Sequence, residues 1–467
     1  MKSRYIKLAT LILAGGFILY TLLALVPYMG RVSVSQETRD AFSMERFYGQ
    51  MESPERVLLL EAPRDAFFHR MNLISNAEEQ ILLASFSIHE GETSDMMVGA
   101  LLAAADRGVD VRILNNGSIA GFMPSRYRDI LAVHPNIDVY LFNQFEFFRP
   151  QYLNAALHDK YMVVDDSFLI FGGRNIGDKY YAPAGYTGRL SLDREVLVYN
   201  TDPAFQGSIS EVRDYFARKR SSDRTFLQNG AGQGDWEAQR DYFVSLYLAH
   251  RDRFAADDFD YYANTIGVNQ ITLLTDPFDT GGRKESIVAY NLMMIARHSE
   301  VIVAQSPYVV LTNPNFAHLA DTVRGRDVTL STNSLASTPN LPAFSSYYVS
   351  RRNLLNTGMT IYEYQSTQAA LHGKTYLFDG RLTAIGSFNL NERSIRSDTE
   401  SMLIIDSETF HDIVLEAIHD QIAQSLRVGA DNRYALDSDV EAAQVPFGKR
   451  PLYLIVGQIM RLFRFLS

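Results

Sequence analysis

The stretch LHDKYMVVDD at residues 157–166 has a near copy, LHGKTYLFDG, at residues 371–380. Both carry histidine, lysine and aspartate in the order H-x-K-x-x-x-x-D, and the two histidines are 214 residues apart. One such pattern is weak evidence, but two copies with matching surroundings are not expected by chance. The chain therefore contains an internal duplication.

The order of predicted elements around the two copies also matches. In the first half we expect strands at residues 78–88, 109–114, 136–142, 160–165, 167–173 and 195–200, and helices at 94–108 and 203–219. In the second half we expect strands at 300–310, 359–365, 374–379, 382–389 and 401–406, a helix with a following strand within 316–334, and a helix at 407–426. Alternating strands and helices in this order predict an α/β fold made of two copies of one unit.

Composition narrows the class of protein. The chain has 467 residues, of which 46% are hydrophobic, and no cysteine, so it folds without disulfides, thiol nucleophiles or cysteine-bound metals. Its formal net charge of -10 disfavours broad electrostatic binding to the phosphates of nucleic acid, and we expect no nucleic-acid partner.

The N-terminus carries a membrane signal. Lys2, Arg4 and Lys7 precede an uncharged apolar run at residues 8–30, which is long enough to span a bilayer as one helix. A cleaved signal peptide is the alternative, but its apolar core is usually shorter, so we favour an uncleaved anchor. Arg31 and Arg39 follow the run, and this small charge bias predicts a cytoplasmic N-terminus and an extracytoplasmic body.

The C-terminal tail leaves two alternatives open. Residues 449–467 are apolar but interrupted by Arg461, so the tail is too short to span a bilayer. It would suit either a helix lying in the membrane interface, with its arginines near anionic headgroups, or a terminal helix packed on the domain.

These observations divide the chain into segments. We expect a cytoplasmic stub and transmembrane anchor at residues 1–30, a stem at 31–51, a first domain at 52–220, a connecting segment at 221–267, a second domain at 268–428 and a tail at 429–467.

The repeated motif suits phosphate chemistry. Residues i and i+2 of a strand point to the same face, so His158 lies beside Lys160, and His372 beside Lys374. A lysine can bind anionic oxygens while an imidazole attacks phosphorus or transfers a proton. One reaction centre needs a nucleophile and an acid for the leaving oxygen, and a duplicated unit supplies one histidine for each. Because each histidine is paired with a cation, we expect no metal and no cofactor.

Further residues repeat after each motif. Asp165 and Asp379 end the motifs; we count them with the catalytic set, although their plainest role is to fix a turn or to bond the lysine or backbone. The words GGRN and GSFN follow, and from them we expect phosphate contacts from Asn175, Ser387 and Asn389. Acidic residues then begin the next strands, and we expect Glu195 and Glu400 to orient the histidines through Nδ1.

With these motifs the sequence resembles the phospholipase D superfamily, whose signature is a doubled H-x-K-x-x-x-x-D followed by G-[SG]-x-N. Within it the chain most resembles the type C-like members of the bacterial cardiolipin synthase branch, in words such as LLAAADRGVDVRIL, FGGRNIGDKYY, LSTNSLAS and LHGKTYLFDGRLTAIGSFNLNERS. The resemblance implies two phospholipase D-like α/β/α sandwich domains facing each other, and a location in the bacterial inner membrane.

The resemblance also implies a mechanism. His158 would attack a phospholipid phosphodiester to form a phosphatidyl-histidine, and His372 would act as acid and base, although these two roles are interchangeable at this stage. Phosphatidylglycerol is the expected substrate, with phosphatidylethanolamine as an alternative donor. The sequence does not identify a helper protein. Where family members often read N-x-D-x-R-S, this chain has Asn391 in place of the aspartate, and it has Asp398 where an asparagine is common; both departures put the choice of acceptor in doubt.

Three functions are compatible with these features. The first is a membrane phosphatidyltransferase that makes cardiolipin. The second is a hydrolase of the same fold, acting on phospholipid or, less in keeping with the acidic charge, on nucleic acid. The third is a non-catalytic membrane scaffold, which the two intact motifs disfavour.

Overall fold

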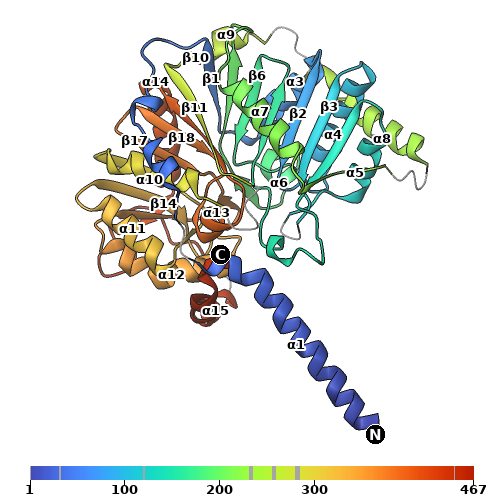
Figure 1. The fold of residues 1–467 in the computed structure, drawn as a ribbon. Helices are drawn as coiled ribbons and strands as arrows, with labels where there is room; N and C mark the ends of the chain where they lie inside the picture. The colour runs from blue at the N-terminus through green and yellow to red at the C-terminus, as the bar shows by residue number, and fades with distance from the viewer. Residues whose placement is uncertain are drawn as a thin grey trace.

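The fold comes from a computed structural model of the full chain. It describes residues 2–30, 33–118, 121–230, 235–254, 259–278, 284–445 and 447–466. Arg31, which enters the charge comparison across the apolar run, lies outside these ranges. The described chain forms two α/β halves that face each other, with one long helix projecting from the molecule (Figure 1).

The first half is built on a mixed sheet with the strand order β10-β1-β8-β6-β5-β2-β3-β4-β9. Its strands are β1 (Glu55–Leu60), β2 (Gln80–Ser85), β3 (Asp110–Asn116), β4 (Ile137–Phe142), β5 (Tyr161–Val164), β6 (Phe168–Gly172), β8 (Glu195–Asn200), β9 (Thr225–Leu227) and β10 (Ile266–Gly267). Its helices are α3 (Pro63–Asn76), α4 (Glu92–Asp106), α5 (Ser125–Ala132), α6 (Asp178–Tyr181), α7 (Ser208–Arg220), α8 (Trp236–Leu248) and α9 (Tyr261–Asn264).

The second half has a sheet with the strand order β11-β20-β18-β17-β12-β14-β15-β21. Its strands are β11 (Gln270–Thr275), β12 (Val301–Gln305), β14 (Asp327–Asn333), β15 (Thr360–Tyr364), β17 (Thr375–Phe378), β18 (Leu382–Gly386), β20 (Ser401–Asp406) and β21 (Ser425–Arg427). Its helices are α10 (Ile287–Arg297), α11 (Asn313–Val323), α12 (Leu341–Leu355), α13 (Glu392–Arg396) and α14 (Glu408–Ile422). The pair β13 (Val309–Val310) and β19 (Leu390–Asn391) forms a small separate ribbon.

The two strand orders are the same when β10 is set aside. Thus β5 corresponds to β17, β6 to β18 and β8 to β20, so the duplicated α/β unit expected from the sequence is confirmed. Most of these strands read as apolar runs because each sheet is covered on both faces.

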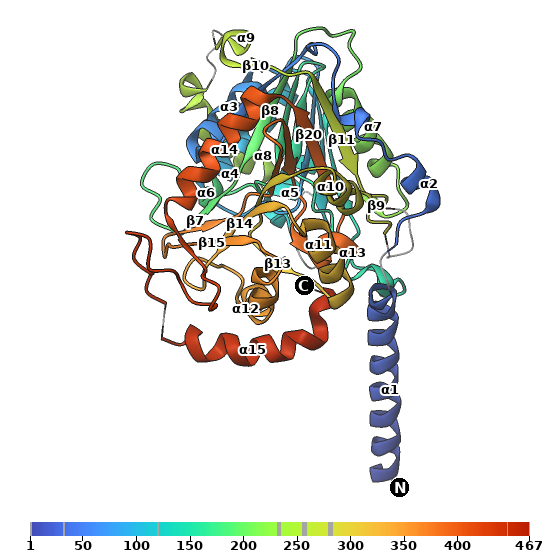
Figure 2. The ribbon, with the colours of Figure 1, turned by 90° about the vertical axis from the view of Figure 1, so that its left-hand side faces the viewer.

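The halves meet through the inner faces of their sheets. One buried cluster contains Val163, Leu169 and Val198 from the first sheet and Leu377 and Ile385 from the second. Helices α7 and α14 lie on opposite sides of this contact (Figure 2). The strands β7 (Leu190–Leu192) and β16 (Ala369–Leu371) pair in parallel across the two halves. The domains therefore share a continuous interface, at which the motifs lie.

The segment expected as a stem is docked on the second half. It forms α2 (Gln36–Asp40) and the short 3-10 turn η1 (Glu45–Phe47). Ser35 N and Thr38 Oγ1 both donate to Glu285 at 2.6 Å, and Phe47 is fully buried in the second core. Apolar side chains within this polar-looking stretch thus make it part of the domain.

The expected connecting segment belongs largely to the first half. Its described parts supply both edge strands, β9 and β10, as well as α8, which packs on α4. Gly99 permits this close approach, because a Cβ there would lie 2.0 Å from Phe243 O. Residues 231–234 and 255–258 of the segment lie outside the described residues.

Both ends of the chain are helical. Helix α1 (Lys2–Met29) contains a stretch, Arg4–Met29, that is long and apolar enough to cross a membrane; among the described helices it alone meets that test of length and composition. Helix α15 (Lys449–Phe463) packs on α12. The aromatic-rich residues 342–349 of α12 face α15.

Candidate active site

The two motifs converge at the interface between the halves. His158 and Lys160 directly precede β5, and His372 and Lys374 directly precede β17. Both lysines are buried, and each donates to the carbonyl oxygen of its own motif histidine. The matching positions of β5 and β17 bring the two H-x-K pairs into one centre.

Each histidine is held by a carboxylate from the opposite half. His158 Nδ1 lies 3.0 Å from Glu400 Oε2, and His372 Nδ1 makes a short hydrogen bond with Asp193. A backbone hydrogen bond also joins the two halves here: the N–H of His372 donates to Leu192 O at 2.6 Å. With Nδ1 engaged, Nε2 of each ring is the nitrogen left for chemistry.

Glu195 does not orient a histidine, and this expectation is wrong. Its carboxylate accepts two hydrogen bonds of 2.6 Å from Arg70 and one of 3.2 Å from Arg174. In the β6–β8 ladder Glu195 pairs with Gly172, whereas in the β18–β20 ladder Met402 pairs with Gly386. Glu195 therefore corresponds to Met402.

Asp193 is the residue that the sequence interpretation missed. The same register places it at the position of Glu400, because the first half has a longer connection before β8. The sequence contained a signal for this choice: DRE at residues 193–195 and DTE at residues 398–400 each have two acidic residues two positions apart. Side chains two apart share a face of a strand, so only the ladder register decides between them.

The residues expected to bind phosphate have different environments. Asn175 donates to Tyr180 OH at 3.0 Å and accepts from Ser87 N at 3.3 Å. The Ser387 hydroxyl donates to Glu400 and accepts from Ser401 N at 3.0 Å, so it positions Glu400 rather than facing a phosphate. The buried Oδ1 of Asn389 has no hydrogen-bond partner among the described residues.

Asp165 and Asp379 lie away from the reaction centre. Each has a positive φ, 51° and 50°, at the far end of its motif strand. Asp165 accepts from the backbone of Glu78, Glu79 and Gln80, while Asp379 accepts from residues 300 and 301. Asp165 lies five positions beyond Lys160 along the strand, a distance of roughly 16 Å. Both aspartates are turn and strand-end residues, and counting them as catalytic was wrong.

Aromatic rings surround the histidines. The Phe86 ring lies 5.2 Å from that of His158, and Lys160 Nζ lies 5.2 Å from the same phenylalanine ring. Tyr180 and Tyr308 approach His372 at 5.7 and 6.5 Å between ring centroids. The sequence interpretation did not single out Phe86, Tyr180 or Tyr308, because all three lie outside the two repeated H-x-K motifs.

Burial controls the protonation of the centre. Burial, followed by the charge of Lys160, depresses the pKa of His158 well below its usual value. Burial and the charge of Lys374 lower the pKa of His372 to about 3. Both rings are thus neutral at physiological pH, as a nucleophile or a general base requires.

The lysines share the same buried environment. Burial, then the nearby Lys374, lowers the pKa of Lys160 to about 7, and burial lowers that of Lys374 to about 8. A bound phosphodiester would favour their charged forms, because an opposite charge stabilises a buried ammonium.

The two orienting carboxylates differ. Burial alone would raise the pKa of Asp193, but Lys374 and then His372 hold it below its usual value. Burial raises the pKa of Glu400 to about 7. The two histidines therefore have unlike partners despite their shared motif.

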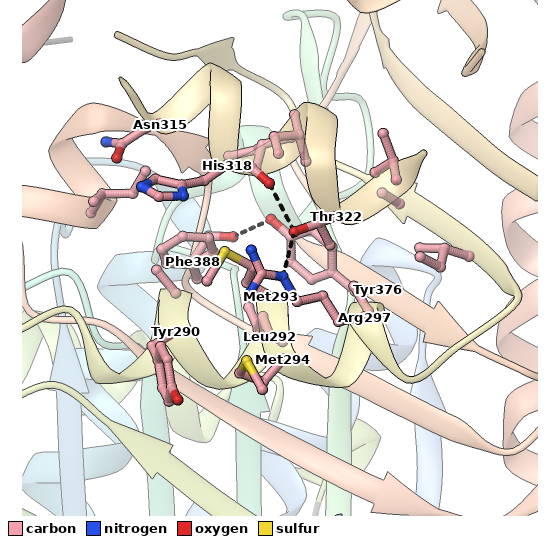
Figure 3. A pocket seen from close by; sticks show the side chains of 18 of the residues that line it. Tyr290, Leu292, Met293, Met294, Arg297, Asn315, His318, Thr322, Tyr376 and Phe388 are labelled. Atoms are coloured by element: carbon pink, nitrogen blue, oxygen red, sulfur yellow. Dashed lines mark hydrogen bonds between the residues drawn. The ribbon is translucent and has the colours of Figure 1, made fainter. Parts of the chain in front are cut away.

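An apolar cavity of about 610 Å³ lies in the second half between α10, α11 and the sheet (Figure 3). Leu292, Met293, Leu319 and Leu330 contribute to its lining. Tyr376 and Phe388 also line it, and Tyr376 OH donates to Phe388 O at 3.0 Å. The second motif's own strand thus forms part of the cavity wall. Within the described ranges, no group of three or more His, Asp or Glu side chains is arranged to hold a metal ion.

A duplicated sandwich with paired H-x-K histidines at its interface defines a protein of the phospholipase D superfamily. The family described as cardiolipin synthase, PLD-like domain, matches residues 71–220 and 293–422, which include both motifs. These ranges cover more than half of the chain, and the protein belongs to this family.

Known proteins extend this comparison. Cardiolipin synthase C of Escherichia coli K12 is 29% identical over 395 residues, which cover 76% of this chain and 82% of the relative. Cardiolipin synthase A of Pseudomonas putida is 26% identical over 374 residues, covering 80% and 69% of the two chains. The solved structure of phosphatidylserine synthase from Haemophilus influenzae has a TM-score of 0.64, covers 92% of this chain and 100% of its own, and is 14% identical, which shows a shared fold.

Proposed function

We propose that the protein is a membrane-anchored phosphatidyltransferase that makes cardiolipin through a phosphatidyl-histidine intermediate. The observation that carries this proposal is the pair of motif histidines at the interface, each held through Nδ1 by a carboxylate of the opposite half. The names of the related cardiolipin synthases support the product.

In the first step Nε2 of His158 attacks the phosphorus of a phosphatidyl donor. The bond from phosphorus to the headgroup oxygen breaks, and His372 gives its proton to that oxygen. The entering phosphate favours a proton on His372 before the step, because its negative charge stabilises an imidazolium. Lys160 and Lys374 bind the phosphoryl oxygens, where charge accumulates. Glu400 and Asp193 keep the rings oriented.

In the second step neutral His372 takes the proton from an incoming hydroxyl, whose oxygen attacks phosphorus and releases His158. When donor and acceptor are both phosphatidylglycerol, the products are cardiolipin and glycerol. A phosphatidylethanolamine donor would release ethanolamine instead. Water as acceptor would give phosphatidic acid, which is the hydrolase alternative.

The deciding experiment uses purified enzyme in mixed micelles that contain a labelled phosphatidyl donor and increasing phosphatidylglycerol. We expect cardiolipin to exceed phosphatidic acid, and His158→Ala enzyme to make neither. Phosphatidic acid as the main product at every phosphatidylglycerol level would replace the synthase with the hydrolase. The same assay with a strong chelator tests the metal-free mechanism, which predicts unchanged activity.

We also propose that α1 spans the bacterial inner membrane once, with the catalytic body outside the cytoplasm. The support is the apolar stretch Arg4–Met29 and the basic residues Lys2, Arg4 and Lys7 at its N-terminal end. A reporter fused to the C-terminus should behave as extracytoplasmic, and cytoplasmic reporter activity would reverse this topology.

A further inference from the structure

Three apolar elements, distant in sequence, lie at the end of the molecule from which α1 projects (Figures 1 and 2). They are α1 itself, the loop at residues 144–149 before the first motif, and α15. Large exposed apolar groups gathered on one face usually mark an interaction site.

The docked end of α1 fixes where a bilayer would end. Ala24 and Tyr28 are buried against the body, and Asn154 Nδ2 donates to Ala24 O at 3.2 Å. Between Tyr5 and Leu23 the helix is about 28 Å long at 1.5 Å per residue. This length matches a hydrocarbon core of about 30 Å, so the membrane surface falls near Leu23.

The loop at residues 144–149 lies at that surface. The rings of Phe147 and Tyr20 stack with centroids 5.0 Å apart, which places the loop beside the membrane-spanning helix. The next ring, Phe148, contacts Phe147 edge-on at 5.3 Å and is 91% exposed. Aromatic side chains at this depth are typical of the membrane interface.

Helix α15 has two different faces. Its inner face packs on α12: the rings of Tyr453 and Tyr348 are 4.8 Å apart, and a Cβ on Gly457 would lie 2.9 Å from Ser345 O. The outward apolar side chains are Leu454, Ile455, Ile459 and Phe463. Arg450 and Arg461 are also exposed. Of the two alternatives left open for the tail, packing on the domain is what the inner face of α15 shows, while the exposed apolar side chains leave the outward face for a further contact.

The direction of α15 suits a bilayer surface. Figure 2 shows it running across the direction of α1, at the level of the upper part of that helix. A helix in this orientation lies parallel to the membrane plane, with its apolar side chains toward the acyl chains and its arginines near headgroups.

We propose that α15 and the loop at residues 144–149 form a second membrane contact, which binds the interface of a bilayer containing anionic phospholipid and holds the catalytic end of the protein against it. The catalytic centre is at this end: Arg393 donates to Asn154 O at 3.4 Å and pairs with Asp398 at 2.9 Å. Asn154 precedes His158 by four residues and also donates to Ala24 O of α1, so the chain that leads into the first motif lies at the docked end of the membrane-spanning helix. The proposal rests on the membrane anchoring in the proposed function.

The absence of cysteine from the sequence permits a direct test in the full chain. Single variants Ile455→Cys and Phe148→Cys carry an environment-sensitive fluorophore in nanodiscs of phosphatidylcholine with phosphatidylglycerol. We expect blue-shifted emission and loss of most fluorescence when nitroxide is placed on lipids at shallow depth. The matched control is Ile413→Cys on α14, an exposed isoleucine at the other end of the protein, which should stay unquenched.

A fourth label separates this proposal from its premise. Leu13→Cys reports whether α1 spans the bilayer, through quenching by nitroxide deep in the acyl chains. Quenching at Leu13 without quenching at Ile455 and Phe148 would overturn the second contact alone. No quenching at Leu13 would remove the anchor itself. Efficient disulfide formation between Ile455→Cys copies, in place of lipid quenching, would overturn the proposal by assigning this face to a second copy of the chain.

Binding of anionic lipid is tested by composition. Replacing phosphatidylglycerol with phosphatidylcholine should weaken quenching of the Ile455→Cys label, and so should Arg461→Glu in the same background. Equal quenching in both lipid mixtures would overturn the electrostatic part of the proposal.

Discussion

The two halves of the protein share a strand order but not an electrostatic environment. In the first half, Asp193 and Gly173 occupy the positions that Glu400 and Ser387 occupy in the second. Asp193 stays ionised beside Lys374, whereas burial raises the pKa of Glu400 to about 7. The pKa values of the two motif histidines are thus both lowered, whereas the pKa values of their carboxylate partners are shifted in opposite directions.

The strongest test of this comparison removes one histidine at a time. His158→Ala and His372→Ala should each lower kcat by about 10³-fold or more, because nucleophilic and acid–base roles cannot substitute for each other. Thermal unfolding should change much less than turnover, since each ring contacts mainly its carboxylate and nearby aromatic side chains rather than the apolar core of either sheet. Near-normal turnover in either variant, measured with labelled donor, would contradict a shared site.

The two acidic residues that flank Arg194 should behave oppositely. Asp193→Asn should lower kcat by about 10²-fold with little loss of stability, because the ring of His372 loses its orienting charge. Glu195→Gln should instead cost about 3 kcal/mol of unfolding free energy, since Arg70 and Arg174 lose a buried partner. Steady-state kinetics and denaturant unfolding of both variants test this prediction. A loss of kcat in Glu195→Gln with a loss of stability in Asp193→Asn would restore Glu195 as the orienting residue.

The pH dependence should reveal the unlike carboxylates. Ionised Glu400 accepts from His158 Nδ1–H and leaves Nε2 free, whereas protonated Glu400 donates to Nδ1 and puts the ring proton on Nε2. Activity should therefore rise with pH, with a midpoint near the Glu400 pKa of about 7. Glu400→Gln should remove this acidic limb, and Asp193→Asn should keep it.

The same ionisation affects stability with a definite sign. The pKa of Glu400 is higher in the folded protein than the usual value of 4.5, so the folded state binds this proton more tightly. Its contribution to stability is therefore complete at low pH and is lost as pH rises through about 7. If the pH–activity profile of Glu400→Gln keeps the acidic limb of the wild-type enzyme, a group other than Glu400 causes that limb.

Making the halves more alike should have a smaller effect. Ser387→Ala removes the hydroxyl that donates to Glu400, so the pKa of Glu400 should rise further and activity at pH 7 should fall about tenfold. The acidic limb should move to higher pH, which loss of folded protein alone would not cause. An unmoved limb would mean that the serine does not tune Glu400.

The smallest effect on catalysis is expected at the motif aspartates. Asp165→Asn should leave kcat per folded molecule unchanged while lowering unfolding free energy by about 1–3 kcal/mol, because backbone N–H groups at the start of β2 lose a charged acceptor. Asp166→Asn, at the neighbouring exposed position, is the control and should change neither quantity by much. A catalytic defect in folded Asp165→Asn protein would return this residue to the reaction centre.

The sequence alone determined the duplicated α/β fold, the convergence of His158 and His372 with their lysines, and Glu400 as an orienting acid. These features were accessible because repeated words and strand periodicity are local properties of the chain. The apolar stretch Arg4–Met29 was equally readable from composition and length.

The tertiary structure decided which acid meets His372. Asp193 and Glu195 share a strand face in the sequence pattern, and only the pairing with β6 sends one to the histidine and the other to Arg70 and Arg174. It also decided that residues 31–51 dock on the second half and that α15 both packs and stays exposed. These outcomes depend on contacts between residues far apart in the chain, whose register and burial no local pattern contains.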